Sequence, residues 1–288
     1  LNEFAEHYSS WLVPEMTYNQ GILQRIRVVQ EALPVTMIAY DALPMSHPEN
    51  YHFTPGTHGN VSEYLRVLRD AQTLVCISEF SRQQMFDVLR RDRSKTTEVA
   101  HPGGDHVPVS ASADPPDRPK FLRVGTMEAR KHPVEIVESF AAAINGGLEA
   151  DLVFIGSPSR VDVVINASVQ RMIDSGYPVQ WITDATDEQV VEHMRSATAF
   201  LSYGIEGFGI PVLEAIRRGS PVLFDGIQPA GDIMEGRGAI RVPLGSDVYG
   251  WRNATAYAIA SRSQRDPNGV PTWRDFAVCV AHACADSS

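Results

Sequence analysis

The stretch TAFLSYGIEGFGIPVLEAIRRGSPVLF, residues 198–224, decides the fold. It opens with an apolar and aromatic run at residues 198–203, which is typical of a buried strand. Gly204, Gly207, Gly209 and Pro211 follow, and proline is favoured in the first turn of a helix. A second strand-like run begins at Pro221. The order strand, turn, helix and strand predicts parallel strands joined through helices, and therefore an α/β fold.

The same alternation continues on both sides of this stretch. Pro133 and the capping box Thr186-Asp187-Glu188-Gln189 mark further helix starts. Repeated strand and helix units predict a doubly wound parallel sheet. The expected strands are residues 121–125, 152–156, 179–183, 198–203, 221–224 and 239–242.

The part before this sheet has a weaker version of the pattern. It predicts strands at residues 35–40, 73–78 and 97–101, and helices at residues 64–71 and 81–91. Between the two parts, residues 107–120 are rich in Ser, Pro and Asp, which favours a linker. The expected organisation is an N-terminal domain at 1–109, a linker at 110–119, a second domain at 120–270 and a C-terminal helix at 271–288.

Composition excludes several classes of protein. The formal net charge of -10 argues against nucleic acid as a partner. The three cysteines have no metal or disulfide spacing, which favours a reducing cytoplasm. No apolar run approaches the roughly 20 residues that span a bilayer, so at most peripheral membrane contact is expected. The basic residues 90–95 are interpreted as a solvated helix end, and His101, His106 and His132 as solvated loop histidines.

Ligands of such sheets bind beyond the carboxyl ends of the strands. Gly207 and Gly209 allow a ligand to approach the backbone, and the helix that follows offers free N–H groups and a positive dipole end. Arg130 and Lys131 follow another strand and add charge, so the sequence predicts an anion site. Carboxylates beside it suit a ligand that combines phosphates with sugar hydroxyls, because carboxylates accept hydrogen bonds from hydroxyls.

From residue 120 onward the chain resembles family 4 retaining glycosyltransferases, which have the GT-B fold of two Rossmann-like domains facing a cleft. The most specific part is Glu206, seven residues and Glu214, the paired-glutamate motif of that family. The resemblance implies that Glu214 holds the ribose of a nucleotide, that Glu206 faces the donor sugar, and that Lys131 binds the diphosphate. The expected donor-binding residues are Gly125, Thr126, Arg130, Lys131, Thr183, Glu206, Gly207, Phe208, Gly209, Ile210 and Glu214.

The first part is similar to the acceptor-side domain of the same family. Asp41 lies in the matching segment, and Tyr40 stands where many members have His. The strand, glycine-rich turn and helix that open this domain in the family are not found before residue 35, and only about three strands are expected. This domain is therefore predicted to be incomplete, and the intact protein to exceed 31.7 kDa. The expected catalytic residues are Glu206, Lys131, Arg130 and Asp41.

The resemblance implies a retaining transfer of a mannose- or glucose-type hexose from a GDP-sugar or UDP-sugar to a saccharide, lipid or small-molecule hydroxyl. No Asp-x-Asp is present, so no metal and no other cofactor is expected. A non-catalytic nucleotide-sugar-binding subunit remains the alternative. A sugar-nucleotide epimerase is disfavoured because no second acid and base pair is found. The sequence leaves the base, the sugar, the acceptor and the oligomeric state open.

Overall fold

The computed structural model describes residues 6–51, 57–111, 114, 116–245 and 247–286. It divides into two compact units, the first formed by Leu1–Gly103 and Pro271–Ser288 and the second by Gly104–Val270. The division follows Gly103, earlier than the boundary that the composition of residues 107–120 indicates. Both units are α/β with parallel strands, so the expected fold class is confirmed.

The second unit is a doubly wound sheet with the strand order β10-β9-β8-β5-β6-β7, parallel throughout. All six predicted strands are present. The elements in chain order are β5 (Lys120–Val124), η2 (Ala129–Lys131), α6 (Pro133–Asn145), β6 (Asp151–Ile155), α7 (Val163–Asp174), β7 (Val179–Ile182), α8 (Asp187–Ser196), β8 (Ala199–Ile205), α9 (Ile210–Arg218), β9 (Val222–Ile227), α10 (Pro229–Ile233), β10 (Ala239–Arg241), α11 (Val248–Ser261) and η3 (Arg262–Gln264).

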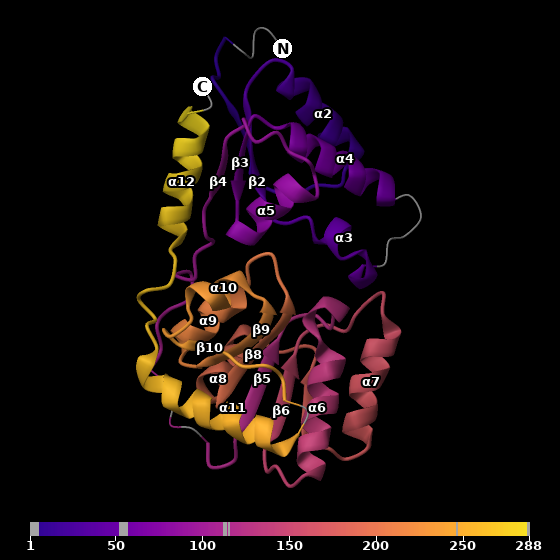
Figure 1. The fold of residues 1–288 in the computed structure, drawn as a ribbon, viewed down its shortest axis with the longest axis vertical. Coiled ribbons are helices and arrows are strands. Elements are labelled where there is room, and N and C mark those ends of the chain that lie inside the picture. Colours follow the sequence, from indigo (N-terminus) through magenta and orange to yellow (C-terminus); the bar gives the residue numbers. More distant parts are fainter. Residues whose placement is uncertain (1–5, 52–56, 112–113, 115, 246, 287–288) are drawn as a thin grey trace. The chain divides into compact units, whose positions relative to one another are not determined.

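Helices cover both faces of this sheet, with α6, α7 and α11 on one face and α8 and α9 on the other (Figure 1). Pro133 is the first residue of α6, and the capping box of Thr186 and Gln189 opens α8, as predicted. Trp251 of α11 packs edge-on against Phe121 and Phe140, at centroid distances of 4.7 and 5.3 Å. This buried apolar core fixes the sheet whose carboxyl edge carries the site.

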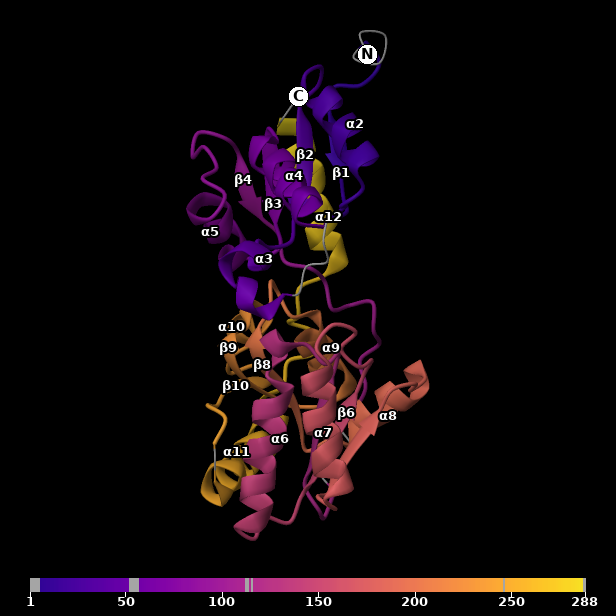
Figure 2. The same ribbon diagram turned by 90° about the vertical axis from the view of Figure 1, so that its right-hand side faces the viewer.

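The first unit contains a four-stranded parallel sheet with the order β1-β2-β3-β4. Its last helix, α12, packs against β3 and β2 (Figure 2). The elements are β1 (Trp11–Val13), α2 (Gln20–Gln30), β2 (Val35–Ala39), α3 (Leu43–Ser46), η1 (Pro48–Asn50), α4 (Thr57–Asp70), β3 (Thr73–Cys76), α5 (Glu79–Asp87), β4 (Thr97–Val99) and α12 (Trp273–Asp286).

The start of this unit corrects one prediction. A strand and a helix, β1 and α2, do precede residue 35, although no glycine pair joins them. Strand β1 is short and lies at the sheet edge, and Trp11 and Leu12 are exposed. Its three residues therefore show no alternating burial pattern that a sequence could reveal.

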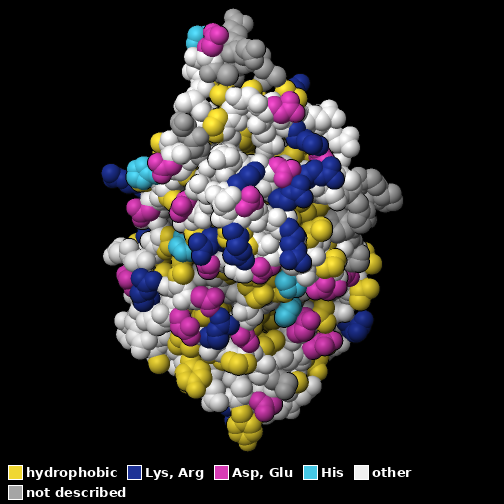
Figure 3. Space-filling model, turned by 45° about the horizontal axis from the view of Figure 1, so that its top comes forward, with side chains coloured by type: hydrophobic (Ala, Val, Ile, Leu, Met, Phe, Trp, Pro, Cys, Tyr) yellow, Lys and Arg dark blue, Asp and Glu magenta, His cyan; other side chains and the backbone are white. Residues whose placement is uncertain are grey.

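Among the basic residues at positions 90–95, Arg91 is buried and Lys95 makes a backbone contact, so the interpretation as a solvated helix end is wrong for Arg91. The buried guanidinium of Arg91 donates to the carbonyl oxygens of Arg69, Ala71, Gln72 and Thr96 and to Thr97 Oγ1. Lys95 Nζ donates to Asp70 O at 2.7 Å. On the face that Figure 3 draws in colour, Lys and Arg side chains are interspersed with Asp and Glu. Within the described ranges, no helix has the length and apolar character needed to cross a bilayer.

Candidate functional site

The candidate site lies at the carboxyl edge of the second unit, where β5 and β8 end. The turn after β5 forms the short helix η2, which carries Arg130 and Lys131. It lies directly on the end of β8, because a Cβ at Gly204 would be 2.0 Å from the Arg130 carbonyl oxygen. Only a residue without a side chain allows this approach. The backbone therefore places both cations beside Glu206, which follows β8.

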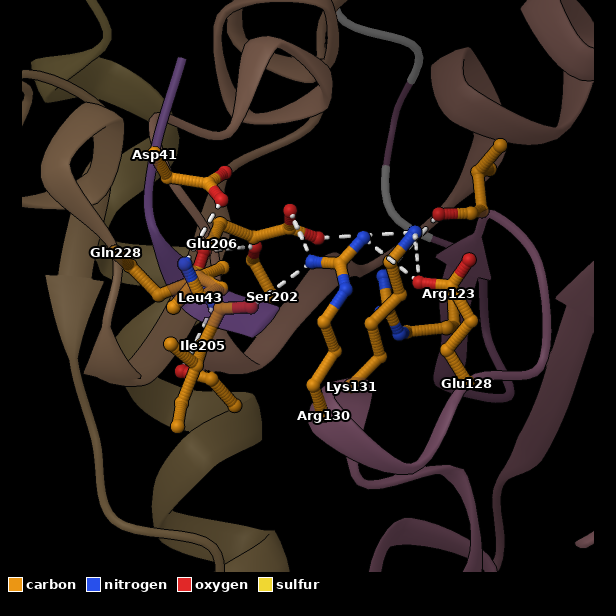
Figure 4. Close-up of polar contacts among 12 residues, drawn as sticks. Asp41, Leu43, Arg123, Glu128, Arg130, Lys131, Ser202, Ile205, Glu206 and Gln228 are labelled. Atoms are coloured by element: carbon orange, nitrogen blue, oxygen red, sulfur yellow. Dashed lines mark hydrogen bonds and ion pairs between the residues drawn. The ribbon is translucent and has the colours of Figure 1, made fainter. Parts of the chain in front are cut away.

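Both cations point toward Glu206 (Figure 4). Arg130 Nη1 donates to Glu206 Oε2 at 2.6 Å and to the Ile205 carbonyl at 2.9 Å. Lys131 Nζ lies 3.7 Å from Glu206 Oε1 and 3.8 Å from Glu128 Oε2, beyond hydrogen-bond length. Glu128 also pairs with Arg130 Nη2 at 2.7 Å. Lys131 is thus attracted by two carboxylates without being fixed by either.

A third cation, Arg123 of β5, is buried next to this cluster and was not predicted. Burial lowers its pKa to about 10, while the negative charge of Glu206 opposes that shift. Burial also lowers the pKa of Lys131, again opposed by Glu206. Arg123, Arg130 and Lys131 face two carboxylates, Glu128 and Glu206, so these five residues have an excess of positive charge. Such a cluster suits an anion although the whole chain is acidic.

The start of α9 completes this edge of the sheet. Gly209 is its N-cap with φ 103°, a left-handed conformation that favours glycine, and Ile210 is its first residue. Phe208 is buried, and its carbonyl accepts from the Ala230 N–H at 2.9 Å. Buried Gln228 receives a hydrogen bond from Ser202 Oγ and donates one to the Gly204 carbonyl. The first turn of α9 is therefore a rigid helix N-terminus, which favours negative charge.

The second glutamate of the motif has a different partner. Glu214 of α9 pairs through Oε1 with His106 Nε2 at 2.8 Å. His106 is an exposed loop residue, as interpreted, but its ring also contacts this carboxylate. The two residues are 108 positions apart in the chain, so no motif spacing could have indicated the contact.

The remaining predicted residues are placed as follows. Gly125 lies under the Lys131 ammonium, since a Cβ at Gly125 would be 3.2 Å from Nζ. The Thr126 carbonyl accepts from the Glu128 N–H and shapes the turn before η2. Thr183 is exposed after β7. Asp41 belongs to the first unit, where Oδ1 accepts from the Leu43 N–H at 3.1 Å.

In the ranges that the structure describes, no three or more His, Cys, Asp or Glu side chains are grouped so that they could hold an ion. Glu206 and Glu128 are instead neutralised by Arg130 and Lys131. Metal-independent activity stays a prediction.

The sequence is similar to those of known glycosyltransferases. Residues 110–235 match the family model described as glycosyl transferases group 1. O-antigen chain mannosyltransferase B of Escherichia coli is 25% identical over 221 residues, 68% of this chain and 58% of that protein. Serotype-specific mannosyltransferase WbdA of Escherichia coli is 26% identical over 208 residues, 65% of this chain and 25% of that protein. The chain thus spans 58% or less of these two relatives' length.

Solved structures share the fold at low sequence identity. Sucrose-phosphate synthase from Thermosynechococcus elongatus matches with a TM-score of 0.69 and 16% identity, covering 99% of this chain and 75% of that one. Anabaena HepE, solved in complex with UDP-glucose, matches with a TM-score of 0.70 and 14% identity, covering 99% and 80%. These likenesses support the GT-B fold. Residues 110–235 are therefore similar to the glycosyl transferases group 1 family, and the mannosyltransferase relatives support a glycosyltransferase.

Proposed function

We propose that this chain is a retaining hexosyltransferase, which transfers a hexose from a nucleotide diphosphate sugar to a hydroxyl group. The observation that carries the proposal is the cluster of Arg130, Lys131 and Glu206 beside the first turn of α9. A sugar diphosphate combines the negative charge that the cations and the helix start attract with hydroxyl donors that carboxylates accept.

The chemistry needs little from the protein beyond position and charge. The bond between the anomeric carbon and the diphosphate oxygen breaks, and its electron pair stays on the diphosphate. The acceptor hydroxyl bonds to the anomeric carbon on the same face and gives its proton to the leaving phosphate oxygen. Arg130, Lys131 and the α9 amides stabilise the charge that develops there. Loss of one such donor typically costs about 3 kcal/mol of barrier.

The donor sugar is proposed to be mannose or glucose. The relatives named above are mannosyltransferases, and a structure of similar fold holds UDP-glucose. The nucleotide is GDP or UDP, with its ribose at Glu214. The acceptor is a saccharide or lipid-linked hydroxyl, and Asp41 of the first unit belongs to the acceptor side. A cytoplasmic location with peripheral membrane contact fits a lipid-linked acceptor.

A panel of GDP-mannose, GDP-glucose, UDP-glucose and UDP-galactose tests the proposal. Differential scanning calorimetry identifies the donor by the rise in melting temperature, because a ligand at 100 times its dissociation constant adds about 2.7 kcal/mol of stability. Release of the nucleoside diphosphate without acceptor then measures hydrolysis. Lys131→Met is expected to lower hydrolysis by roughly 100-fold or more. Arg171→Met, which removes an exposed cation in the last turn of α7, serves as the matched control.

The outcomes separate the two functions that the sequence left open. Binding with hydrolysis, and a product of unchanged anomeric configuration by NMR once an acceptor is supplied, supports a retaining transferase. Binding without hydrolysis or transfer favours the non-catalytic subunit. If none of the four donors raises the melting temperature, the nucleotide-sugar site itself is wrong.

A further inference from the structure

The pair of His106 and Glu214 adds a residue to the site that no sequence motif indicates. His106 precedes the buried Val107, on the segment at residues 104–110 that runs along α9. Its Nε2 lies 2.8 Å from Glu214 Oε1, and both side chains remain partly open to solvent, at 40% and 26% exposure. The pair is thus accessible to a ligand.

The segment at residues 104–110 is held along α9 by close backbone packing and by two hydrogen bonds. A Cβ at Gly104 would lie 2.6 Å from Leu213 Cβ, so this backbone lies against the helix. Arg217 then holds the segment twice, because its Nε donates to the Val107 carbonyl at 2.8 Å and its own carbonyl accepts from the Ser110 N–H at 2.8 Å. These contacts fix the backbone on both sides of His106 and thereby position its ring against Glu214.

Stability does not explain this arrangement. Ion pairs this exposed contribute roughly 0–1 kcal/mol to the free energy of unfolding. The carboxylate that His106 contacts is, under the proposed function, the one that accepts hydrogen bonds from the ribose. Glu214 is four residues after Ile210, so the two lie on one face of α9, and the Cα–Cβ bond of Glu214 tilts toward the anion-binding end of the helix. One contact at Oε1 still leaves acceptor positions on the carboxylate for two neighbouring hydroxyls.

We propose that His106 is a positioning residue for Glu214, and that it sets the preference of the donor site for a ribose with both hydroxyls. This inference rests on the proposed function, because it takes Glu214 as the ribose acceptor. By holding Oε1 from one side, the imidazole limits the rotamers of Glu214 before the nucleotide arrives. The side-chain entropy of Glu214 is then already reduced in the unliganded protein, so less of it is lost when the nucleotide binds.

Calorimetry with paired nucleotides tests this role. The dissociation constants of GDP and UDP are compared with those of 2′,3′-dideoxy-GDP and 2′,3′-dideoxy-UDP, for the parent, His106→Leu and His106→Gln. His106→Leu removes the nitrogen that contacts Glu214. His106→Gln keeps a side-chain N–H donor of similar reach. His282→Leu, an exposed position in α12 of the first unit, is the matched control, and melting temperatures verify folding.

The parent is expected to prefer the ribose form of the nucleotide that it binds. His106→Leu should weaken binding of that form roughly three- to tenfold and leave the dideoxy form unchanged. His106→Gln should recover most of the preference, and His282→Leu should match the parent.

Two results would overturn the inference while leaving the proposed function intact. One is an undiminished ribose preference in His106→Leu, and the other is an equal loss for both forms, which means a structural role. Failure of the parent to bind either diphosphate would instead refute the proposed function, and the inference with it.

Discussion

The contact between Gly204 and the turn that carries the cations makes Gly204→Ala the most informative single change. Gly204 has φ 98°, and its missing Cβ would lie 2.0 Å from the Arg130 carbonyl oxygen and 3.0 Å from Lys131 Cα. No rotation of an alanine side chain relieves a clash with backbone. The substitution must therefore push the η2 turn away from the end of β8, or distort β8 itself.

The loss of stability expected for Gly204→Ala has two parts. The left-handed conformation costs an alanine roughly 1–2 kcal/mol, and overpacking typically costs a further ~1–3 kcal/mol. Gly176 isolates the first part, because its φ is 82° and an added Cβ would meet nothing within 4 Å. We expect Gly176→Ala to lower the unfolding free energy of the second unit by roughly 1–2 kcal/mol, and Gly204→Ala by roughly 2–5 kcal/mol.

Thermal and denaturant unfolding of both variants, together with nucleotide titration, provide the measurement. Displacing the Arg130 carbonyl also displaces the guanidinium that lies 2.6 Å from Glu206, so Gly204→Ala should lose nucleotide affinity at temperatures where it is still folded. Gly176→Ala should bind like the parent. If the two variants are equally stable and bind equally well, the close approach of η2 to β8 does not position the cations.

Three further predictions concern the ligand. Glu214→Ala should weaken binding of GDP or UDP, whereas Glu206→Ala should mainly lower turnover. Calorimetry measures the first effect and donor hydrolysis the second. Unchanged nucleotide affinity in Glu214→Ala would contradict its role at the ribose. Transfer should persist in EDTA, and a complete loss that Mg²⁺ or Mn²⁺ restores would refute metal independence. Because burial lowers the pKa of Lys131 below 10.5, its positive charge is lost earlier as pH rises. Nucleotide affinity should accordingly fall on approach to pH 10.5. This slope should be smaller in Lys131→Met, where Arg123, with its pKa lowered to about 10, still titrates.

The strands of the second unit could be predicted because each is a continuous apolar run buried on both faces of a parallel sheet. Helix starts were equally readable, since Pro133 and the capping box at Thr186 act within a few residues. Strand β1 could not be predicted, because three residues at an exposed edge give too short a pattern. Strands and helix starts were thus predictable wherever the residues of one short segment determine them.

The site was predictable only in outline. Arg130 and Lys131 were expected at the carboxyl edge, but their pairing with Glu206 joins residues about 75 positions apart. Arg123 is a strand residue whose neighbours are apolar, and nothing in its segment distinguishes a buried cation from a surface one. His106 and Glu214 are separated still further in sequence. Such contacts depend on the packing of whole elements, which no short window of sequence encodes.

The different partners of the two glutamates explain why both occur around one glycine turn. Three buried or half-buried cations without a ligand would repel one another in a region of low dielectric constant. Glu206 and Glu128 offset that repulsion, and a diphosphate can replace their attraction when it binds. Glu214 contacts His106 instead and lies a turn further along α9. Under the proposed function, Glu206 balances the charge of the cations, and Glu214, which lies away from them, is available to accept hydroxyls of the nucleotide sugar.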